Sequence, residues 1–572
     1  MEKQKLSYKK RRRQEQKKNE NPSVLIVSGI AAIFFIVITA VYPLYITDEK
    51  YIALTGPKTF FFWTVTIIAA SLILVTLFFR KNNFFIKDYY IENEPVRVLS
   101  VSEWAVLAFI ALTFISAVAA SFNRDVVIDG PNRMMVNEIV WRGYRQRYEG
   151  FISFLCYVMT FFIIARFYRP KRLHLILFAG SACLVSLIGI LQFFGHDIFN
   201  LFPFEDMLQY RGLDYGPLSA FFRTTLGNVN IVSAYCSFAI VLFAALFAVS
   251  RSKWQYAYLG AGAMSFALSR TTGGSGDAHA VAIAGAMVIL IPYWLADRVR
   301  LGKVLIALAS WCVVFAGYSA YMSALKNRFE ADPSSFTALD QGFISTYAPR
   351  SPVTFLVLAA VLIAAGLSLI LLLKKWPERP MKIAGIVFLP AAFIIGISGV
   401  LILGSRFAPG NMIWEMREIL HGRIADEFGS GRIWIWRHAL SVLFDNPILG
   451  TGPDTFYYAL GPEIQRASIE AFNVTFDKAH NIFLQIAVCM GIPALLAYLT
   501  YVVSLFVSAV KKAFERPLLL AFGAAALSYM IQSFFCVEVP ITTPLVWIAF
   551  GVMAAEVWMG KIGAAGLSES DI

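Results

Sequence analysis

The sequence predicts an all-α fold, a polytopic bundle of about 14 transmembrane helices with one large extracytoplasmic loop. The 572 residues are 58% hydrophobic and only 15% charged, whereas a soluble domain is closer to one quarter charged. The apolar residues form uninterrupted runs of about twenty, the length that crosses a bilayer as a helix. They do not alternate with polar residues, which excludes a β-barrel as well as a soluble or disordered chain.

Short basic segments between the apolar runs predict the orientation of the bundle. The segments RFYRPKR, SRSK, DRVRLGK and KKAFERP are rich in lysine and arginine, as cytoplasmic loops usually are. We therefore expect a multi-pass protein of the cytoplasmic (cell) membrane with both termini in the cytoplasm. The predicted spans are 24–45, 59–79, 102–121, 151–167, 173–194, 228–249, 255–269, 279–296, 303–323, 353–373, 383–404, 479–509, 517–535 and 541–559.

Two cytoplasmic tails are predicted to flank a single transmembrane domain at 23–560. The first tail, 1–22, contains much of the net charge of +13 and no apolar pattern, so we expect it to be disordered. It either keeps the N-terminus inside or attracts anionic lipid headgroups. The second tail is 561–572. We expect membrane lipids, and no nucleic acid, as partners of these basic segments.

Long polar segments are predicted on the outer face. Loops without structure of their own rarely exceed about 12–15 residues unless they bind or gate something. Each of these segments combines arginine with acidic and aromatic residues, which predicts a functional surface there. They are 122–150, 195–227, 324–352 and, the largest, 405–478.

The sequence contains no pattern for a metal or nucleotide cofactor. It has no G-x-x-x-x-G-K-[ST] loop, no aspartates two residues apart and no histidine cluster of the zinc type. Its six cysteines lie in or beside apolar runs without paired spacing. We therefore expect no cofactor, no metal site, and a reaction that uses no cytosolic nucleotide.

Four arginines lie near the outer ends of the predicted spans. Arg147, Arg223, Arg270 and Arg432 each stand at or close to such an end, although an arginine in hydrocarbon costs about 2.5–3.5 kcal/mol. A guanidinium group presents a planar donor fork that matches phosphate oxygens. These residues predict a pyrophosphate clamp at the outer surface; the alternative is that each one reaches lipid headgroups.

The segment 429–495 is the most informative part of the sequence. Gly429 to Gly431 form a flexible entry to Arg432, and the apolar stretch at 433–444 then predicts a helix that ends at Asp445-Asn446-Pro447. A glycine-rich turn follows at 447–456, whose backbone N–H groups could face an anion.

His480 stands where the last long span is predicted to begin. Asp477 and Lys478 precede it and Asn481 follows it. A histidine at a membrane mouth is able to accept a proton from an attacking hydroxyl, because its pKa is near neutral. The alternative is a histidine that bonds locally at the start of the helix.

Together these motifs resemble the O-antigen ligase and O-antigen polymerase family of integral membrane glycosyltransferases. The resemblance covers about 142–500 and is strongest from 429 to 499. It rests on the order and spacing of several motifs in the chain. These are RYEG (147–150), TLGNVN (225–230), SR (269–270), GSGRIWIW (429–436), DNPILGTGPDTF (445–456), DKAHNIFLQ (477–485) and GIPALLAYL (491–499).

The resemblance implies a fold like the C-type glycosyltransferases and a reaction on the outer face of the cytoplasmic membrane. The donor would be a glycan on undecaprenyl pyrophosphate, and the acceptor a hydroxyl of a glycan, lipid or protein. His480 and Arg432 would be catalytic, and Arg223, Arg270 and Arg432 would bind the pyrophosphate. The supporting residues would be Asp477, Lys478, Asn481, Asp454 and Glu149.

One segment departs from the family pattern. After Ser269-Arg270 the family continues with bulky apolar residues, but this chain reads TTGGSGDAHA. The departure predicts either a flexible turn or a contribution of Asp277 or His279 to the outer rim.

The sequence leaves other functions open. A lipid-linked oligosaccharide flippase, or another secondary transporter, would have a similar number of spans. Transporters place their charges near the middle of the bilayer, whereas here the charges gather at the outer edge, which favours an enzyme. A ligase and a polymerase differ only in the acceptor, and no motif distinguishes them.

Overall fold

The computed structural model describes residues 22–51, 53–79, 99–129, 132–201, 221–272, 276–347, 350–373, 375–407, 409–410, 412–561 and 566–572. Almost all of the predicted tail at 1–22 and much of the predicted outer segment at 195–227 lie outside these ranges.

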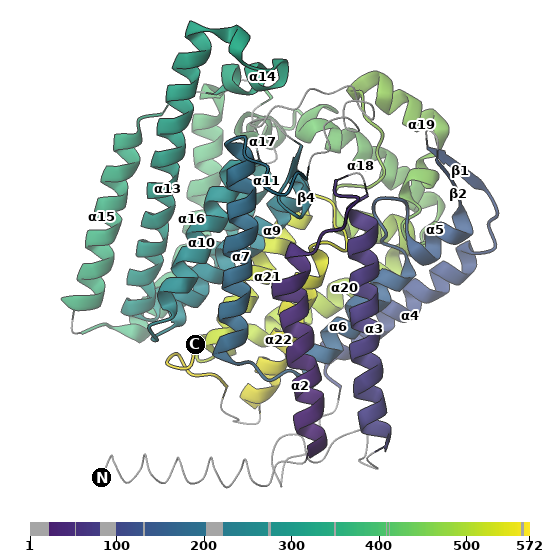
Figure 1. The fold of residues 1–572 in the computed structure, drawn as a ribbon, viewed down its shortest axis with the longest axis horizontal. Helices are drawn as coiled ribbons and strands as arrows, with labels where there is room; N and C mark the ends of the chain where they lie inside the picture. Colours follow the sequence, from purple (N-terminus) through teal and green to yellow (C-terminus); the bar gives the residue numbers. More distant parts are fainter. Residues whose placement is uncertain are drawn as a thin grey trace.

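The described chain is nearly all helical, which confirms the predicted all-α membrane fold. Long helices stand side by side as a bundle (Figure 1). The helices in the predicted spans are α2 (Pro22–Ile36) with its continuations η1 (Val37–Val41) and η2 (Tyr42–Leu44), α3 (Thr55–Phe79), α4 (Val101–Ala120), α6 (Phe151–Phe167), α7 (Arg172–Phe193), α9 (Val229–Val249), α10 (Gln255–Arg270), α11 (Gly276–Ile289), α12 (Ile291–Leu295), α13 (Arg298–Ala331), α15 (Pro352–Leu371), α16 (Glu378–Leu403), α20 (Ile482–Val510), α21 (Pro517–Ser533) and α22 (Thr543–Lys561).

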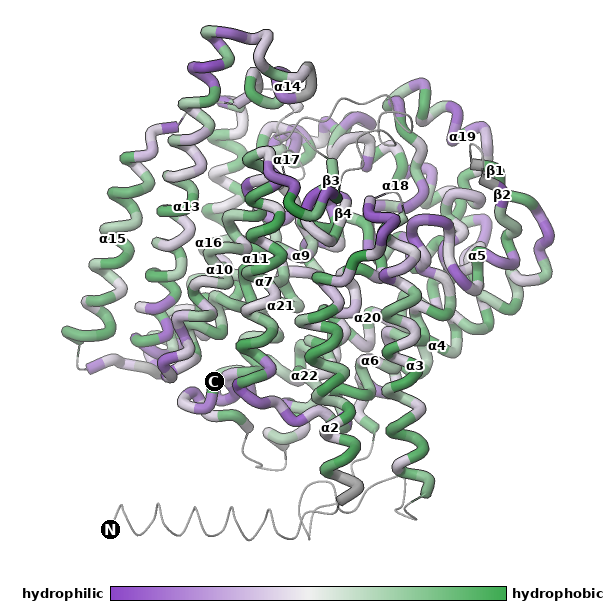
Figure 2. Tube along the Cα trace, in the orientation of Figure 1, coloured by the Kyte–Doolittle hydropathy of each residue, from purple (hydrophilic) through white to green (hydrophobic). Residues whose placement is uncertain are grey.

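Ten helices in the described part of the chain are long and apolar enough to cross a membrane. The tube in Figure 2 is hydrophobic along the shafts of these helices and more polar at their ends. The predicted spans at 151–167, 255–269, 279–296 and 517–535 contain shorter helices, namely α6, α10, α11 with α12, and α21. The total of fourteen spans therefore stays a prediction.

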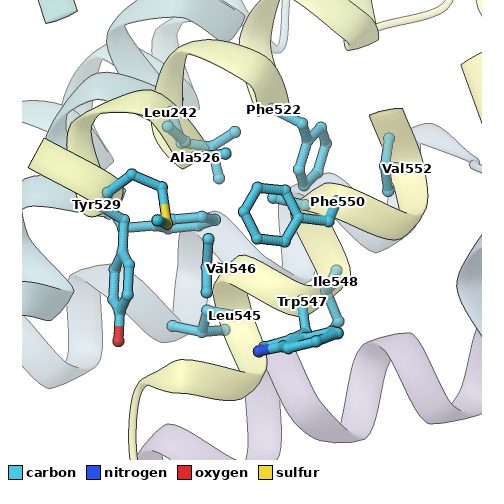
Figure 3. Close-up of a cluster of buried hydrophobic side chains, with 14 of the residues drawn as sticks. Leu242, Phe522, Ala526, Tyr529, Leu545, Val546, Trp547, Ile548, Phe550 and Val552 are labelled. Carbon is cyan, nitrogen blue, oxygen red and sulfur yellow. The ribbon is translucent and has the colours of Figure 1, made fainter. Parts of the chain in front are cut away.

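The centre of the bundle is α9, which is buried almost along its whole length. It packs against α10, α11, α13 and α21. Figure 3 shows Leu242 of α9 near Phe522 and Ala526 of α21 and Phe550 of α22. Because such a core holds the helices in fixed positions, it also fixes the segments that connect them.

The helices α15 and α16 form an outer part of the bundle. No residue in the most apolar window of α16 is buried, and Phe393 and Ile402 are each 70% exposed. In a membrane such a surface faces lipid. α15 instead packs closely on α13, where a Cβ at Gly302 would lie 2.7 Å from the carbonyl oxygen of Gly366; small residues permit this approach between membrane helices.

Most of the connecting elements gather at one end of the bundle, the upper end in Figure 1. The segment predicted as the loop 405–478 is itself mostly helical there. The connecting elements are β1 (Val126–Asp129), β2 (Asn132–Met135), α5 (Val136–Arg142), β3 (Phe222–Arg223), β4 (Gly227–Asn228), η4 (Pro333–Ser335), α14 (Ala338–Thr346), η5 (Gly404–Arg406), α17 (Met412–Leu420), α18 (Phe428–Asp445) and α19 (Phe456–Phe472), with η6 (Lys512–Phe514) between α20 and α21.

The C-terminal residues dock at the opposite end of the bundle (Figure 1). Glu569 forms ion pairs of 2.8 Å with both Arg251 and Arg300. The Tyr258 hydroxyl donates to the carbonyl oxygen of Ile572 at 3.1 Å, and Ile572 is fully buried. The end of the predicted tail at 561–572 is therefore folded against the bundle.

Candidate functional site

The residues predicted around His480 lie at the start of α20. The Asn481 side chain caps this helix, because its Oδ1 accepts from the backbone N–H groups of Phe483 at 3.0 Å and Leu484 at 3.1 Å. An asparagine at this position satisfies N–H groups that have no partner within the helix. His480 is therefore held directly before the first turn of a long helix.

His480 adopts a left-handed backbone conformation, with φ of 51°. This conformation is uncommon for residues other than glycine. Two hydrogen bonds of the preceding residue, Ala479, hold His480 in place. The Ala479 N–H donates to Gln485 Oε1 at 2.8 Å, and its carbonyl accepts from Trp436 Nε1 at 2.8 Å. The position of His480 thus depends on both α18 and α20.

Lys478 lies at the centre of a buried ionic network, which we call the Lys478 network and define as Glu149, Asp454 and Lys478. Lys478 Nζ is 2.8 Å from Glu149 Oε2 and 2.5 Å from Asp454 Oδ1. Asp454 Oδ2 also accepts from the backbone N–H groups of Tyr144 at 2.6 Å and Glu149 at 2.9 Å. The network therefore joins three segments that are distant in the sequence.

Electrostatics keep Lys478 charged within this network. Burial lowers the pKa of Lys478, but Asp454 and Glu149 raise it by more, so its pKa lies above the ordinary value. Burial raises the pKa of Glu149 to about 7, although Lys478 opposes this change. The lysine charge is matched by neighbouring carboxylates and is not available to a ligand.

Arg147 is likewise matched by a carboxylate. Its Nε and Nη2 donate to the two oxygens of Asp477 at 2.6 and 3.0 Å, a bidentate pair. Burial raises the pKa of Asp477, but Arg147 lowers it by more, so the carboxyl stays ionised. Of the four arginines predicted as a clamp, Arg147 thus serves an internal ion pair.

Arg432 is held in a different way, by backbone carbonyl groups. Its Nε donates to the carbonyl of Phe535 at 2.8 Å, and its Nη1 donates to the carbonyl of Gly429. The preceding residues Gly429, Ser430 and Gly431 all have positive φ, which makes the turn that brings the Gly429 carbonyl back to the side chain. No described carboxylate lies within ion-pair distance of Arg432, so its positive charge is not compensated by the described residues.

His480 responds to this charge, and we call the two residues the Arg432–His480 pair. Burial and the nearby Arg432 lower the pKa of His480 to about 3, with Asp477 opposing them and Arg147 adding to them. The imidazole is therefore neutral at physiological pH and keeps a lone pair. A cation and a neutral base lie together here, partly exposed at one end of the bundle.

Arg223 and Arg270 form a second cationic group. Arg223 Nε donates to the carbonyl of Thr271 at 3.2 Å, and Thr271 directly follows Arg270. The side chain of Arg223 is fully buried, with its guanidinium 5.5 Å from the ring centroid of Phe193. Two sets of these arginines can be distinguished, one with Arg432 and one with Arg223 and Arg270, and their role as a clamp stays a prediction.

The turn at η2 connects the surroundings of these two sets. Thr225 Oγ1, near Arg223, donates to the carbonyl of Pro43 at 2.6 Å. The Tyr42 hydroxyl donates at 2.6 Å to the carbonyl of Pro540, in the same α21–α22 connection that holds Arg432. The turn at Tyr42 and Pro43 therefore helps to fix the segments that carry both sets of arginines.

The glycine-rich turn at 447–456 does not present its central amides to an anion, contrary to one prediction. The N–H groups of Thr451 and Gly452 donate to the carbonyls of Val488 and Cys489 in α20, at 3.1 and 2.8 Å. These carbonyls are open because α20 kinks at Gly491 and because Pro493 has no N–H to donate. The turn thus completes a broken helix and positions Asp454 for Lys478.

The segment after Arg270 also differs from one prediction. His279 lies in α11, is fully buried and bonds to Arg270, so it does not lie on an exposed rim. Asp277 lies in the first turn of α11, and its side chain is outside the described part of the molecule.

Glu538 is a buried acidic residue that our sequence analysis did not select. It lies in the connection between α21 and α22, and its Oε1 has no hydrogen-bond partner among the described residues. Burial and then the nearby Glu149 raise its pKa to about 8, while Ser533 and Lys478 lower it. The sequence signal for this residue was a single carboxylate in the otherwise uncharged stretch FFCVEVPITTP.

In the described residues, no group of three or more His, Cys, Asp or Glu is arranged to hold a metal ion.

The fold and this site define the chain as a multi-pass helical membrane protein with a polar site at one end of its bundle. Residues 344–499 match the family model described as O-antigen ligase. The match is confined to this part of the chain, where it bears out the resemblance to the O-antigen ligase and polymerase family. It includes Arg432, Asp454, Lys478 and His480, whereas Glu149, Arg223 and Arg270 precede it. No curated protein matches the chain.

Proposed function

We propose that the chain is a membrane glycosyltransferase that moves a glycan from undecaprenyl pyrophosphate to an acceptor hydroxyl. The observation that carries this proposal is the Arg432–His480 pair, in which an uncompensated cation lies beside a neutral base. The cation would bind the pyrophosphate, and the neutral base would accept the proton of the hydroxyl nucleophile. The family match supports the same class of reaction.

The arginines would bind and stabilise the pyrophosphate. In the transfer, the acceptor oxygen forms a bond to the sugar C1 while the bond from C1 to the phosphate oxygen breaks. Negative charge grows on the departing lipid pyrophosphate, and Arg432, with Arg223 and Arg270, would stabilise it. Preorganised donors of this kind contribute about 2.7–4 kcal/mol each to a rate. The reaction would need neither a metal nor a nucleotide.

His480 would take the proton of the acceptor hydroxyl, and the donor itself would make it able to do so. A pKa of about 3 is too low for an effective base in the empty site. A negative charge at ~5 Å, with an effective dielectric constant of ~20, stabilises the imidazolium by about 3 kcal/mol, or about 2 pKa units. The two charges of a bound pyrophosphate would therefore bring the pKa of His480 close to 7.

The Lys478 network would hold these groups in position. Lys478 lies two residues before His480 and is bonded to Glu149 and Asp454. Asp477, which pairs with Arg147, and Asn481, which caps α20, fix the residues on either side of it. We assign these residues to support of the site, because their charges and bonds are taken up within the protein.

The site would face the outside of the cytoplasmic membrane. The short basic segments lie between spans at the other end of the bundle, where the C-terminal residues also dock. By the positive-inside rule that end would be cytoplasmic. Lipid-linked glycans would therefore meet the Arg432–His480 pair after they have crossed the membrane.

A transfer assay tests the proposal. The purified chain would be mixed with an undecaprenyl-pyrophosphate-linked oligosaccharide in lipid nanodiscs, without metal or nucleotide and with or without an acceptor glycan. We expect transfer with the native chain, and a loss of at least about 100-fold with Arg432→Ala or His480→Ala. A ladder from donor alone identifies a polymerase, and product only with acceptor identifies a ligase.

Matched controls lie on the same helix as Arg432. Arg437 is 57% exposed and paired with Asp426, and His438 bonds to the Trp434 carbonyl; we expect Arg437→Ala and His438→Ala to retain transfer within about twofold. Full activity in Arg432→Ala and His480→Ala would refute the site. Donor movement across the bilayer without any transfer would support a flippase instead.

A further inference from the structure

Arg270 is held by a buried histidine that lies outside the family match. Arg270 Nη2 is 2.8 Å from His279 Nε2, and His279 Nδ1 is 3.2 Å from Ser233 Oγ. The three residues come from α10, α11 and α9, respectively. They form a continuous polar chain across three helices of the bundle.

The bonds determine which form of His279 is present. The guanidinium of Arg270 only donates, so the Nε2 that it contacts must be an acceptor with a free lone pair. The proton of the neutral imidazole is then on Nδ1, where it donates to Ser233 Oγ. His279 therefore accepts from Arg270 without adding a negative charge.

The surroundings of Arg270 restrict its side chain further. Its Nε donates to Ser269 Oγ at 3.2 Å, and its guanidinium lies 5.2 Å from the ring centroid of Phe266. His279 and Ser233 are fully buried, and Ser233 belongs to α9 at the centre of the bundle. A long side chain that is held this way loses little further entropy when it binds a ligand.

We propose that His279 is a positioning residue that orients the Arg270 guanidinium for the pyrophosphate of the donor, an inference that rests on the proposed function. A carboxylate at this place would also orient the arginine, but it would cancel the charge that an anionic ligand needs. A neutral acceptor fixes the direction of the guanidinium and adds no negative charge of its own. The inference goes beyond the family pattern, in which bulky apolar residues follow Arg270.

Steady-state kinetics of the full chain in nanodiscs test this role. We expect His279→Leu to raise the KM for the lipid-pyrophosphate donor about tenfold, the effect of one lost charge-assisted hydrogen bond. The KM for the acceptor should not change. His279→Gln, whose amide oxygen replaces Nε2 as an acceptor, should recover the donor KM to within about threefold.

A double-mutant cycle separates positioning from a general packing effect. If His279 acts through Arg270, the variant that combines His279→Leu with Arg270→Ala should be no worse than Arg270→Ala alone. His174→Leu is the matched control, because His174 is also buried and bonds to the Tyr168 hydroxyl at 3.1 Å; it should leave the donor KM unchanged.

Ser233→Ala provides a second route if His279→Leu does not fold. It removes the acceptor for Nδ1–H, and we expect a rise of about threefold in donor KM that disappears in the Arg270→Ala background. Additive effects, or an unchanged donor KM in His279→Leu, would overturn the inference while the proposed function stands. Full activity of Arg270→Ala would refute the placement of Arg270 itself, whereas the results for Arg432 and His480 test the proposed function separately.

Discussion

The Lys478 network and the Arg432–His480 pair lie at the same end of the bundle and are built on opposite principles. Lys478 is 3% exposed and contacts two carboxylates, so its charge is compensated within the protein. Arg432 contacts two carbonyl oxygens, which accept from its Nε and Nη1 and do not neutralise its charge. One cation is bound into the structure, and the other is available to an anion.

Under the proposed function, this difference separates residues that support the site from residues that carry out the reaction. A buried ion pair contributes little net stability, but removal of one partner leaves a costly buried charge. An arginine that is bonded only to carbonyl dipoles keeps an uncompensated charge, which lowers the stability of the protein but attracts an anionic ligand. Changes in the Lys478 network should therefore lower stability first, whereas changes in the Arg432–His480 pair should lower activity first.

The largest effect should follow from Lys478→Met. It leaves Glu149 and Asp454 buried without a cation, which typically costs about 3–5 kcal/mol. We expect a clear fall in Tm in detergent, measured by thermal unfolding, and partial recovery when Glu149→Gln is added. Lys326→Met is the control, because within the described residues Lys326 donates to the Tyr347 carbonyl and forms no ion pair. An unchanged Tm in Lys478→Met would remove the distinction between the two regions.

A smaller effect, on activity alone, should follow from Arg432→Lys. Lysine keeps the charge but has no planar fork for two oxygens. We expect kcat/KM for the donor to fall about 10- to 100-fold, with Tm unchanged. Arg437→Lys, on the exposed side of α18, should change neither quantity. If Arg432→Lys lowered Tm as much as Lys478→Met, Arg432 would belong to the support and not to the chemistry.

The pH dependence of stability should reveal Glu538. Its pKa rises from 4.5 to about 8 in the folded protein, so between these values the folded state keeps a proton that the unfolded state has lost. Stability from this group is therefore greatest at low pH and is lost as pH rises. His480 acts in the opposite sense, and its contribution fades as pH rises above 6.5, the ordinary pKa of histidine. Glu149, with a pKa of about 7, adds to the loss of stability at the lower end of the range.

We therefore expect Tm to fall as pH rises from about 6.5 to about 8, and Glu538→Gln to flatten the curve. Thermal unfolding over this range measures both. Glu463→Gln, at an exposed acidic residue of α19, is the control and should leave the curve unchanged. A slope that Glu538→Gln leaves unchanged would place the titrating group elsewhere.

The smallest effect should follow from Asn481→Ala. The loss of this helix cap costs about 1 kcal/mol, so we expect a slight fall in Tm. Asn481→Asp, which also has an acceptor oxygen at the cap, should restore it. A large loss of stability in Asn481→Ala would mean that the residue does more than cap α20.

The fold was largely predictable from the sequence, and the site was predictable in part. Apolar runs of about twenty residues determine membrane helices wherever they occur, which is why α3, α7 and α9 match the predicted spans. The break in the long span at 479–509 occurs at Gly491 and Pro493, which our sequence analysis did not identify as its site. Glu538 was not selected, because nothing in its local sequence indicates which distant carboxylate it approaches.

Hydrophobicity and charge are properties of the chain itself, so the sequence alone determined the membrane bundle, the positions of the arginines and the start of a long span close to His480. Which carboxylate pairs with which cation depends on which segments meet in space. Only the tertiary structure therefore decided which of the cations are paired with carboxylates. It paired Arg147 with Asp477 and Lys478 with Glu149 and Asp454. It gave Arg432 backbone carbonyls as partners in place of a carboxylate, and it brought His279 into contact with Arg270.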